Sequence, residues 1–448
     1  MNGELPKGWV WTSLGEVTEN PQYGWTTRAT TEGNVHLLRT TDITSGKIDW
    51  SSVPYCEEEP ENIEKYLLKD GDIVISRAGS VGYSYLLENP QNSIFASYLI
   101  RFKPIINNFF LSYFLKSSIY WEAISEKSIG IAMANVNASK LKQIEVPLPP
   151  LAEQQRIVNK IEELFTNLDK GIESLKQVKY KLKIYRQAIL KYAMEGKLTE
   201  KWREENKDKI DFFSYKSEES NDKLPKNWVW TSLENIVDIL DNRRIPINAE
   251  EREKRINNKD ESQLYPYYGS TGQVGWIDEY IFDEELILLG EDGAPFLDFI
   301  KDKAYLINGK SWVNNHAHVL RAIKDISVNP FICYYLNSFD YRKYITGTTR
   351  YKLNQSQMKK IIVPLPPLEE QHKIVEHIEQ LFSLADYIEE TVGSKLEQSK
   401  TLRQSILKKA FEGKLVPQDP NDEPAELLLE KIKKQRLNKE ELVQEKLV

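Results

Sequence analysis

An internal repeat of almost half the chain length is the feature that most constrains the fold. The segment LPKGWVWTSL at residues 5–14 returns as LPKNWVWTSL at residues 224–233, with nine of ten positions identical and an offset of 219 residues. VPLPPLAEQQRIV at residues 146–158 returns as VPLPPLEEQHKIV at residues 363–375, with an offset of 217 residues. A period this long indicates a duplicated plan, because solenoid repeats are only about 20–50 residues long.

Between these matched segments the two copies differ. The first copy reads DGDIVISRAGSVGYSYLL where the second reads YPYYGSTGQVGWIDEYIFDEELILLGEDGAP. A repeated framework around different modules favours two modules that perform one kind of task on different targets. Ordinary drift after duplication is the alternative explanation.

Each copy closes with a long amphipathic segment, which starts after a proline pair and stops at Gly196 or Gly413. Its apolar residues recur in steps of three and four, the pattern of a coiled-coil seam. The seam residues are Val158, Ile161, Phe165, Leu168, Ile172, Leu175, Leu182, Tyr185, Ile189 and Ala193, then Ile378, Leu381, Ala385, Ile388, Val392, Leu396, Leu402, Ile406 and Ala410. Each helix should contain about 45 residues and span roughly 65–70 Å.

The simplest partner for each long helix is the other one, packed antiparallel; the alternative is that each helix covers its own module. We therefore predict an α+β fold with an internal pseudo-twofold repeat, in which two mixed α/β domains are joined by two long antiparallel helices that form a coiled coil. The expected boundaries are a first domain at 1–146, a helical spacer at 147–203, a linker at 204–223, a second domain at 224–363, a second helical spacer at 364–415 and a C-terminal tail or helix at 416–448.

Charge and cysteine content exclude several classes of protein. The net charge is −7, although residues 152–203 carry twelve basic and seven acidic side chains, a local surface that could attract phosphate or an acidic partner. Cys56 and Cys333 are the two cysteines, which excludes a disulfide framework and fits a reducing compartment. No run of about 18 apolar residues occurs, so we expect a cytoplasmic protein without a membrane span.

The first module offers a strand that leads into a glycine-rich turn. Residues 72–76 are expected to form a buried strand, followed by RAGSVG, in which Gly79 allows close backbone approach to a ligand. Arg77 suits a guanine edge or a phosphate, and Ser80 lies beside it. Arg39 and Lys127 are lesser candidates for DNA contact. A tight turn beside a surface arginine would give the same pattern.

In the second module, YPYYGSTGQVG has the composition of a loop that can lie against a sugar-phosphate edge. Its candidates for DNA contact are Tyr267, Ser270, Thr271 and Gln273, although the tyrosines equally suit a core turn.

SWVNNHAHVL at residues 311–320 alternates as a strand would, with Val313, Ala317 and Val319 on one face and Asn314, His316 and His318 on the other. Asn314 suits adenine, and the two histidines suit phosphate. Lys310 and Arg350 complete this set of candidates. Zinc binding would need Cys333 and an acid besides the histidines, so we favour a polar face without metal.

Motifs for catalysis are missing from the sequence. An adenine methyltransferase has an Asn/Asp-Pro-Pro-aromatic tetrad, and the nearest segment here is VNPF at residues 328–331. No phosphate-binding GxxxxGK[ST] loop, nucleophile elbow or HExxH motif occurs. GEDG at residues 290–293 is best explained as an acidic turn. We therefore predict no catalytic and no metal-binding residues.

The paired PLPPLAEQQRIVNKIEELF and PLPPLEEQHKIVEHIEQLF segments, the LPKGWVWTSL openings and EGKLVPQDPNDEPAELLLEKIK near the end carry a family resemblance over nearly the whole length. The chain resembles the specificity subunit of type I restriction-modification systems. The resemblance implies two target recognition domains that each read half of a split, asymmetric site on double-stranded DNA. It also implies helical spacers that dock two methyltransferase subunits, and through that complex restriction subunits.

By the same resemblance, this subunit is non-catalytic and holds no cofactor, whereas its partners use S-adenosylmethionine, and ATP with magnesium. Two alternatives from other classes are a self-sufficient adenine methyltransferase with cryptic catalytic residues and a symmetric scaffold that never touches DNA.

Overall fold

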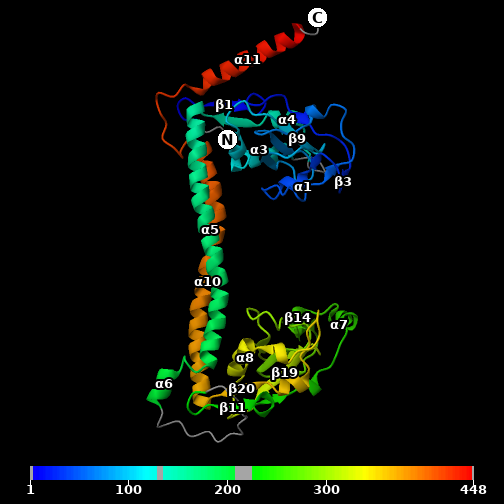
Figure 1. Ribbon diagram of the computed structural model, residues 1–448, viewed down its shortest axis with the longest axis vertical. Coiled ribbons are helices and arrows are strands. Elements are labelled where there is room, and N and C mark those ends of the chain that lie inside the picture. The colour runs from blue at the N-terminus through cyan, green and yellow to red at the C-terminus, as the bar shows by residue number, and fades with distance from the viewer. Residues whose placement is uncertain (1–3, 129–134, 207–223, 446–448) are drawn as a thin grey trace. The chain divides into compact units, whose positions relative to one another are not determined.

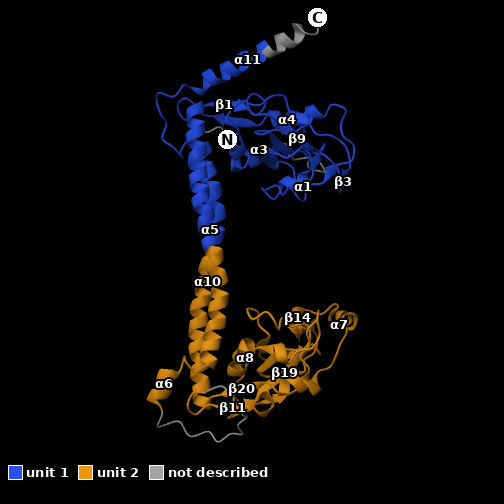
Figure 2. Ribbon diagram, viewed as in Figure 1, with its two compact units in different colours: residues 1–174, 395–448 blue, residues 175–394 orange. Residues whose placement is uncertain are grey.

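The protein, described here by a computed structural model, forms two compact units that each combine one domain with half of each long helix. The structure describes residues 4–128, 135–206 and 224–445, without the side chains of residues 127, 128 and 439–445. The first unit comprises residues 1–174 with 395–448, and the second comprises residues 175–394 (Figure 2). The units therefore divide the chain within the long helices rather than at their ends.

The first unit has two four-stranded sheets and a separate two-stranded sheet. One four-stranded sheet has the order β2-β9-β6-β7 and the other the order β3-β5-β4-β8. The strands are β1 Val10–Ser13, β2 Gln22–Tyr23, β3 Ala29–Thr30, β4 His36–Leu38, β5 Tyr55–Cys56, β6 Ile73–Ser76, β7 Ser84–Leu86, β8 Ser93–Phe95, β9 Leu99–Phe102 and β10 Glu145–Leu148. Its helices are α1 Thr40–Ile43, η1 Ile63–Lys65, α2 Asn108–Phe114, α3 Ser118–Ser128 and α4 Ala138–Lys142.

The second unit repeats this layout with different strands. Its four-stranded sheets have the orders β12-β19-β16-β17 and β14-β13-β18-β15. The strands are β11 Val229–Ser232, β12 Val237–Ile239, β13 Tyr265–Gly269, β14 Gly272–Ile277, β15 Phe282–Asp283, β16 Leu286–Gly290, β17 Ala304–Ile307, β18 Lys310–Val313, β19 Ala317–Ala322 and β20 Ile362–Leu365. Its helices are α6 Glu200–Glu205, η2 Leu233–Asn235, η3 Asp241–Arg243, α7 Ala249–Ile256, η4 Glu261–Gln263, α8 Asn329–Ser338, η5 Tyr341–Lys343 and α9 Gln355–Lys359.

The repeated segments of the sequence form the same small sheet in each unit. In the first unit β1 pairs antiparallel with β10, so that Val10 lies opposite Leu148. In the second unit β11 pairs antiparallel with β20, so that Val229 lies opposite Leu365. The Trp-containing opening of each copy therefore returns to the strand that leads into its long helix.

The long helices are α5 Leu151–Met194 and α10 Leu368–Phe411, each of 44 residues (Figure 1). In the first unit Ile157 and Ile161 of α5 share a core with Ile406 and Ala410 of α10. In the second unit Ile189 and Ala193 of α5 share a core with Ile374 and Ile378 of α10. The start of each helix thus packs against the end of the other, which confirms the predicted antiparallel pair.

The predicted seam is wrong at one repeated position. Tyr185 is 41% exposed and Leu402 is 50% exposed, although both were assigned to the seam. The next residues, Arg186 and Arg403, contact the opposite helix instead. An α-helix has 3.6 rather than 3.5 residues per turn, so a stripe counted in heptads drifts around the helix by about 20° per heptad.

A further helix, α11 Ala425–Glu445, follows α10 and packs on the first unit. Ala425 and Ile432 are buried in the core that also contains Trp9 and Leu14. Arg156 of α5 holds Asp422, just before α11, with Nη2 to Oδ2 at 2.5 Å. In the described part of the chain, no helix is both long enough and apolar enough to span a membrane.

Candidate nucleic-acid interface

The glycine-rich turn of the first unit lies between β6 and β7, as predicted. All four residues of β6 are buried, and the strand ends directly before Arg77. Gly79 has a φ of 80°, which favours glycine, and open space surrounds the position of its absent Cβ. Ser80 lies in the same turn and is partly exposed. The turn therefore leaves room for a ligand above Gly79.

Arg77 is held over the ring of Tyr23, with 5.0 Å between its guanidinium carbon and the ring centroid. Its main-chain N–H donates to Tyr98 O at 2.9 Å, while its buried Nε has no hydrogen-bond partner within the part of the chain that the structure describes. Tyr98 itself is strongly exposed. An arginine stacked on one tyrosine beside a second, exposed tyrosine provides charge and ring faces, which suit phosphates and bases.

Arg39, another candidate of the first unit, is less free to bind DNA than Arg77. Arg39 precedes α1 and makes a two-point ion pair with Asp42, with Nη2 to Oδ1 at 2.8 Å and Nε to Oδ2 at 3.1 Å. Much of its hydrogen-bonding capacity therefore stabilises the α1 turn. Lys127 lies in the last turn of α3, and its side chain is outside the described part of the structure.

In the second unit, the segment predicted as a loop is a β-hairpin. Strands β13 and β14 pair antiparallel, and Ser270 and Thr271 form the turn between Gly269 and Gly272. Thr271 and Gln273 are exposed, so their side chains are accessible to DNA. These residues therefore lie at the end of a β-hairpin and not in the irregular loop that the sequence predicted.

Tyr267, another candidate for DNA contact, is only 3% exposed, so its side chain lies in the interior in this structure. Its ring packs in a small core with Ile277 and Trp312, and the guanidinium of Arg252 covers it at 4.8 Å. The alternation of β13 turns this side chain to the interior, whereas the neighbouring turn stays at the surface.

The single strand predicted at residues 311–320 is also wrong. The chain turns at residues 314–316, and the strands on either side, β18 and β19, belong to different sheets. Asn314 Oδ1 accepts the main-chain N–H of His316 at 2.8 Å, which is a turn made by an Asn side chain. Lys310 is exposed at the start of β18, with its Nζ 4.8 Å from the ring centroid of Tyr280.

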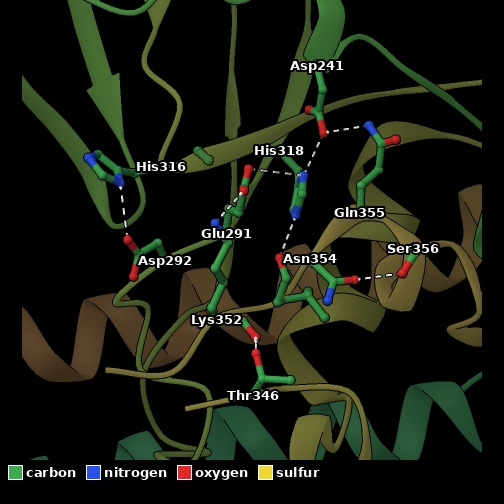
Figure 3. Close-up of polar contacts among 12 residues, drawn as sticks. Asp241, Glu291, Asp292, His316, His318, Thr346, Lys352, Asn354, Gln355 and Ser356 are labelled. Atoms are coloured by element: carbon green, nitrogen blue, oxygen red, sulfur yellow. Dashed lines mark hydrogen bonds and ion pairs between the residues drawn. The ribbon is translucent and has the colours of Figure 1, made fainter. Parts of the chain in front are cut away.

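His318 was predicted to share a polar face with Asn314 and His316, yet its side chain is fully buried. In Figure 3, dashed lines join its ring to Asp241 and Glu291. Its Nδ1 lies 2.6 Å from Asp241 Oδ2, and its Nε2 lies 2.8 Å from Leu353 O. The two contacts hold the ring between a carboxylate and a main-chain carbonyl. Burial alone would raise the pKa of Asp241, but the bonds from His318 and from Val319 N hold that pKa below its ordinary value.

The same network pins the segment that carries Arg350. Leu353 N donates to Glu291 O at 2.8 Å, and Gly293 N donates to Tyr351 O at 3.0 Å. At the surface, Asp292 pairs with two predicted residues: Arg350 Nε at 2.7 Å and His316 Nδ1 at 3.5 Å. The structure therefore brings Arg350 and His316 together through a carboxylate that the sequence pattern did not identify.

The ligand set that zinc would need can be compared with the acidic and histidine side chains of the second unit. Among the described residues, one group of three possible ligands, Asp241, Glu291 and His318, has its ligand atoms within 4.8 Å of one another, and it excludes Cys333. Arg244 Nη1 lies 2.9 Å from Glu291 Oε2 and supplies a positive charge there. Burial raises the pKa of the Cys333 thiol in α8 to about 12, which opposes a thiolate ligand.

Two arginines of α7 were also missed by the sequence reasoning. Arg252 covers Tyr267, and Arg255 lies over the Trp312 ring at 5.2 Å. Their spacing of three residues places them on one face of a helix, which was the available signal.

Comparisons with known proteins give a consistent result over most of the chain. Residues 6–183 and 225–398 match the family described as the type I restriction modification DNA specificity domain. The chain is 28% identical to the type I restriction enzyme StySPI specificity subunit of Salmonella potsdam, over 97% of this chain and 96% of that protein.

Two solved structures have a similar fold. One is the HsdS subunit from Thermoanaerobacter tengcongensis, with a TM-score of 0.54, 20% identity and coverage of 92% of this chain and 98% of that one. The other belongs to work on complex assembly and conformational transition of the type I R-M system, with a TM-score of 0.61, 19% identity and coverage of 92% and 100%.

Proposed function

Because the chain belongs to the type I restriction modification DNA specificity family, we propose that each of its two units reads one half of a split DNA site. The chain is the DNA sequence-specificity subunit of a type I restriction-modification system. The duplication is the observation that supports recognition of a split site by two units. The family match occurs twice, each time over one domain and most of the long helix that follows it.

The proposed readers in the first unit are the side chains around the β6–β7 turn. Arg77, stacked on Tyr23, is the candidate for base contact, because arginine can make two hydrogen bonds to guanine. Gly79 and Ser80 would let the backbone approach a phosphate.

In the second unit, the proposed readers are the β13–β14 turn and the surface cluster around Asp292. Ser270, Thr271 and Gln273 supply small polar groups, and Arg350 with His316 supplies positive charge that Asp292 orients. Asn314 and Lys310 lie at opposite ends of β18 and complete the set.

The two long helices are proposed to act as the spacer between the half-sites and as the docking surface for two methyltransferase subunits. A helix of 44 residues spans about 66 Å, close to two turns of B-DNA. Two weak half-sites on one spacer bind selectively together only where their separation fits, so the spacing becomes part of the recognised sequence.

We further propose that the chain is not itself an enzyme. The partner methyltransferase subunits would bind S-adenosylmethionine and methylate adenine, and the restriction subunits of the complex would use ATP with magnesium. The absence of a methyltransferase tetrad from the sequence supports this division of labour.

The test is to map methylated adenines in DNA incubated with S-adenosylmethionine and either the purified chain or the chain assembled with its methyltransferase subunits. We expect methylation at one split site with the assembled complex and none with the chain alone. Methyl transfer by the chain alone would contradict the proposal and favour a self-sufficient methyltransferase. Exchange of a recognition domain should change one half-site, and an unchanged site would favour a scaffold.

A second test addresses the spacer. Insertion of four residues near Leu175, about one helical turn, is expected to change the number of bases between the two half-sites and leave the half-sites themselves unchanged. An unchanged methylated site in this variant would count against the helices as spacer.

A further inference from the structure

Each unit contains the same arginine-centred contact between the two long helices. In the first unit Arg403 of α10 lies over the ring of Phe165 in α5 at 4.3 Å and pairs with Asp169 of α5. In the second unit the roles of the helices are exchanged. Arg186 of α5 lies over the ring of Phe382 in α10 at 5.1 Å, and its Nη2 donates to Asp386 Oδ1 at 2.6 Å.

A tyrosine from the adjoining recognition domain extends each contact. Tyr113 of α2 packs edge-on against Phe165, with 5.8 Å between ring centroids and an interplanar angle of 87°. Tyr334 of α8 packs against Phe382 at 5.8 Å and 82°. Burial raises the pKa of both tyrosines to about 12, as expected for phenols that are shielded from water.

These groups form one stack per unit, which we name the clamp: tyrosine, phenylalanine, arginine and aspartate. Each clamp joins a recognition domain to one long helix, and that helix to the other. The three clamp positions on the long helices repeat with the offset of 217 residues, so that Phe165, Asp169 and Arg186 correspond to Phe382, Asp386 and Arg403. The clamp is therefore part of the duplicated framework, although neither arginine lies in the apolar seam.

The two clamps require the same register between the helices. Phe165 and Arg186 are 21 residues apart on α5, and Phe382 and Arg403 are 21 residues apart on α10, three heptads in each case. A slip by one heptad would place Lys179 opposite Phe382 and would break both arginine contacts. It would also separate Lys179 from Glu389, which are 3.7 Å apart between Nζ and Oε1 in the second unit. Polar contacts of this kind select one register of a helix pair.

Arginine suits the clamp better than lysine does. Its planar guanidinium can stack on a ring with one face while its edge binds a carboxylate, which a lysine ammonium cannot do. The two arginines are 21% and 35% exposed, whereas Asp386 and Asp169 are 71% and 61% exposed, so the ring contacts are better shielded from solvent than the ion pairs are.

We propose that Arg186 and Arg403 are specificity-determining positions outside the recognition domains. Each arginine holds the two helices together at the ring on which the domain's tyrosine packs, and together they restrict the number of bases that separate the two half-sites. This inference rests on the proposed function, because it assigns the spacing of the half-sites to particular side chains.

The first experiment measures spacing selectivity with the full chain assembled with its methyltransferase subunits. The substrate is a DNA library in which the two half-sites are separated by every spacer from three to nine bases, and methylated adenines are counted for each spacer. We expect the wild-type complex to prefer one spacer at least about tenfold over its neighbours, since each tenfold needs only a modest difference in binding free energy. R186A/R403A should lower that preference to about threefold or less, with the same bases in each half-site.

Control variants keep the result interpretable. K183A/K409A removes two exposed charges from the same helices and should keep the wild-type preference. F165L/F382L keeps apolar side chains but removes both rings, and should lower the preference as the arginine variant does. A wild-type preference in either clamp variant that still unfolds cooperatively would overturn the proposal.

The second experiment does not depend on DNA. Spin labels at Glu61→Cys and Lys324→Cys, which are exposed positions of the two units, report the distribution of distances between them in the full chain. The native Cys56 and Cys333 are buried and should label poorly. We expect R186A/R403A and F165L/F382L to broaden the distribution and K183A/K409A to leave it unchanged; equal widths in all variants would contradict the clamp. If the wild-type complex shows no site-selective methylation, the proposed function fails, while this measurement still decides whether the clamps restrain the units.

Discussion

Trp9 Nε1 donates a buried hydrogen bond of 3.0 Å to Glu153 Oε2 and so ties the opening of the first copy to the first turn of α5, 144 residues later. The second copy has the same bond, from Trp228 Nε1 to Glu370 Oε2 at 2.9 Å. The two carboxylates differ in their second oxygen. Glu370 Oε1 accepts from Thr199 Oγ1 at 2.7 Å and from Arg203, whereas the buried Glu153 Oε1 has no hydrogen-bond partner among the described residues.

This difference predicts unequal effects of one substitution at equivalent positions. Glu370→Gln should destabilise the second unit by about 2–3 kcal/mol, because Arg203 and Thr199 lose a charged acceptor in a buried site. Glu153→Gln keeps an acceptor for Trp9 and should cost less than about 1 kcal/mol. Urea unfolding followed by tryptophan fluorescence measures both values. Equal losses in the two variants would contradict the asymmetry.

Glu153 also predicts a dependence of stability on pH. Burial raises its pKa above the ordinary 4.5, despite the bond from Trp9 and the charge of Arg156. The folded protein therefore binds this proton more tightly than the unfolded chain does, so its stability should fall as the pH rises from 4.5 through the raised value. Subtraction of the Glu153→Gln profile isolates the effect of this group. The prediction would be contradicted if the free energy of unfolding of the wild type increased relative to that of Glu153→Gln as the pH rises.

The glycines of the long helices predict opposite effects of alanine. Gly171 and Gly393 lie in helix interiors with open space at the Cβ position, so alanine should stabilise the protein by roughly 0.5–1 kcal/mol at each site. Gly196 has a φ of 71°, and an added Cβ would lie 2.4 Å from Pro225 Cγ. Gly196→Ala should therefore destabilise the protein by at least about 1 kcal/mol, and thermal unfolding distinguishes the two directions.

Arg77 and Arg350 predict losses that are confined to one half-site each. Arg77→Ala should lower methylation of the native site about 10–100-fold and relax the bases of the first unit's half-site, because a two-point arginine contact discriminates by 1–3 kcal/mol. Arg350→Ala should relax only the other half-site. Each variant is the control of the other when methylated sequences are compared. Relaxation of both half-sites in either variant would argue against separate reading.

Tyr267 and Gln273 provide a test within one hairpin. Tyr267 is buried, and its hydroxyl donates a long bond of 3.5 Å to Ile247 O, so Tyr267→Phe should leave the methylated sequence unchanged. Gln273 is exposed, and Gln273→Ala should relax the half-site that the second unit reads. A change of specificity in Tyr267→Phe would mean that the ring leaves its core when DNA binds.

The repeat, the long helices and the family could all be obtained from the sequence, because these features are encoded by local or regularly spaced residues. Proline pairs before Leu151 and Leu368, apolar steps of three and four, and glycines at the ends define the two helices without reference to the rest of the fold. Similarly, Asp72 and the apolar run before Arg77 predicted the buried strand β6. Strong periodicity over many residues is what a sequence expresses most reliably.

Tertiary structure decided which side chains of these elements face outward. Asn314 and His316 have the alternation of a strand, but a side-chain hydrogen bond turns the chain there, so that β18 and β19 enter different sheets. The segment around Tyr267 has the composition of a binding loop. In the structure Arg252 of α7 covers the Tyr267 ring, and β13 pairs with β18, a strand that is distant along the chain.

The clearest case is the pair of clamps. The sequence determined that α5 and α10 would pair, since both carry the same apolar stripe. Only the packed structure decided that Arg186 and Arg403, rather than Tyr185 and Leu402, face the opposite helix. The reason is physical: burial of a long arginine depends on a ring and a carboxylate supplied by another segment, and no local pattern of apolar residues records such a partner.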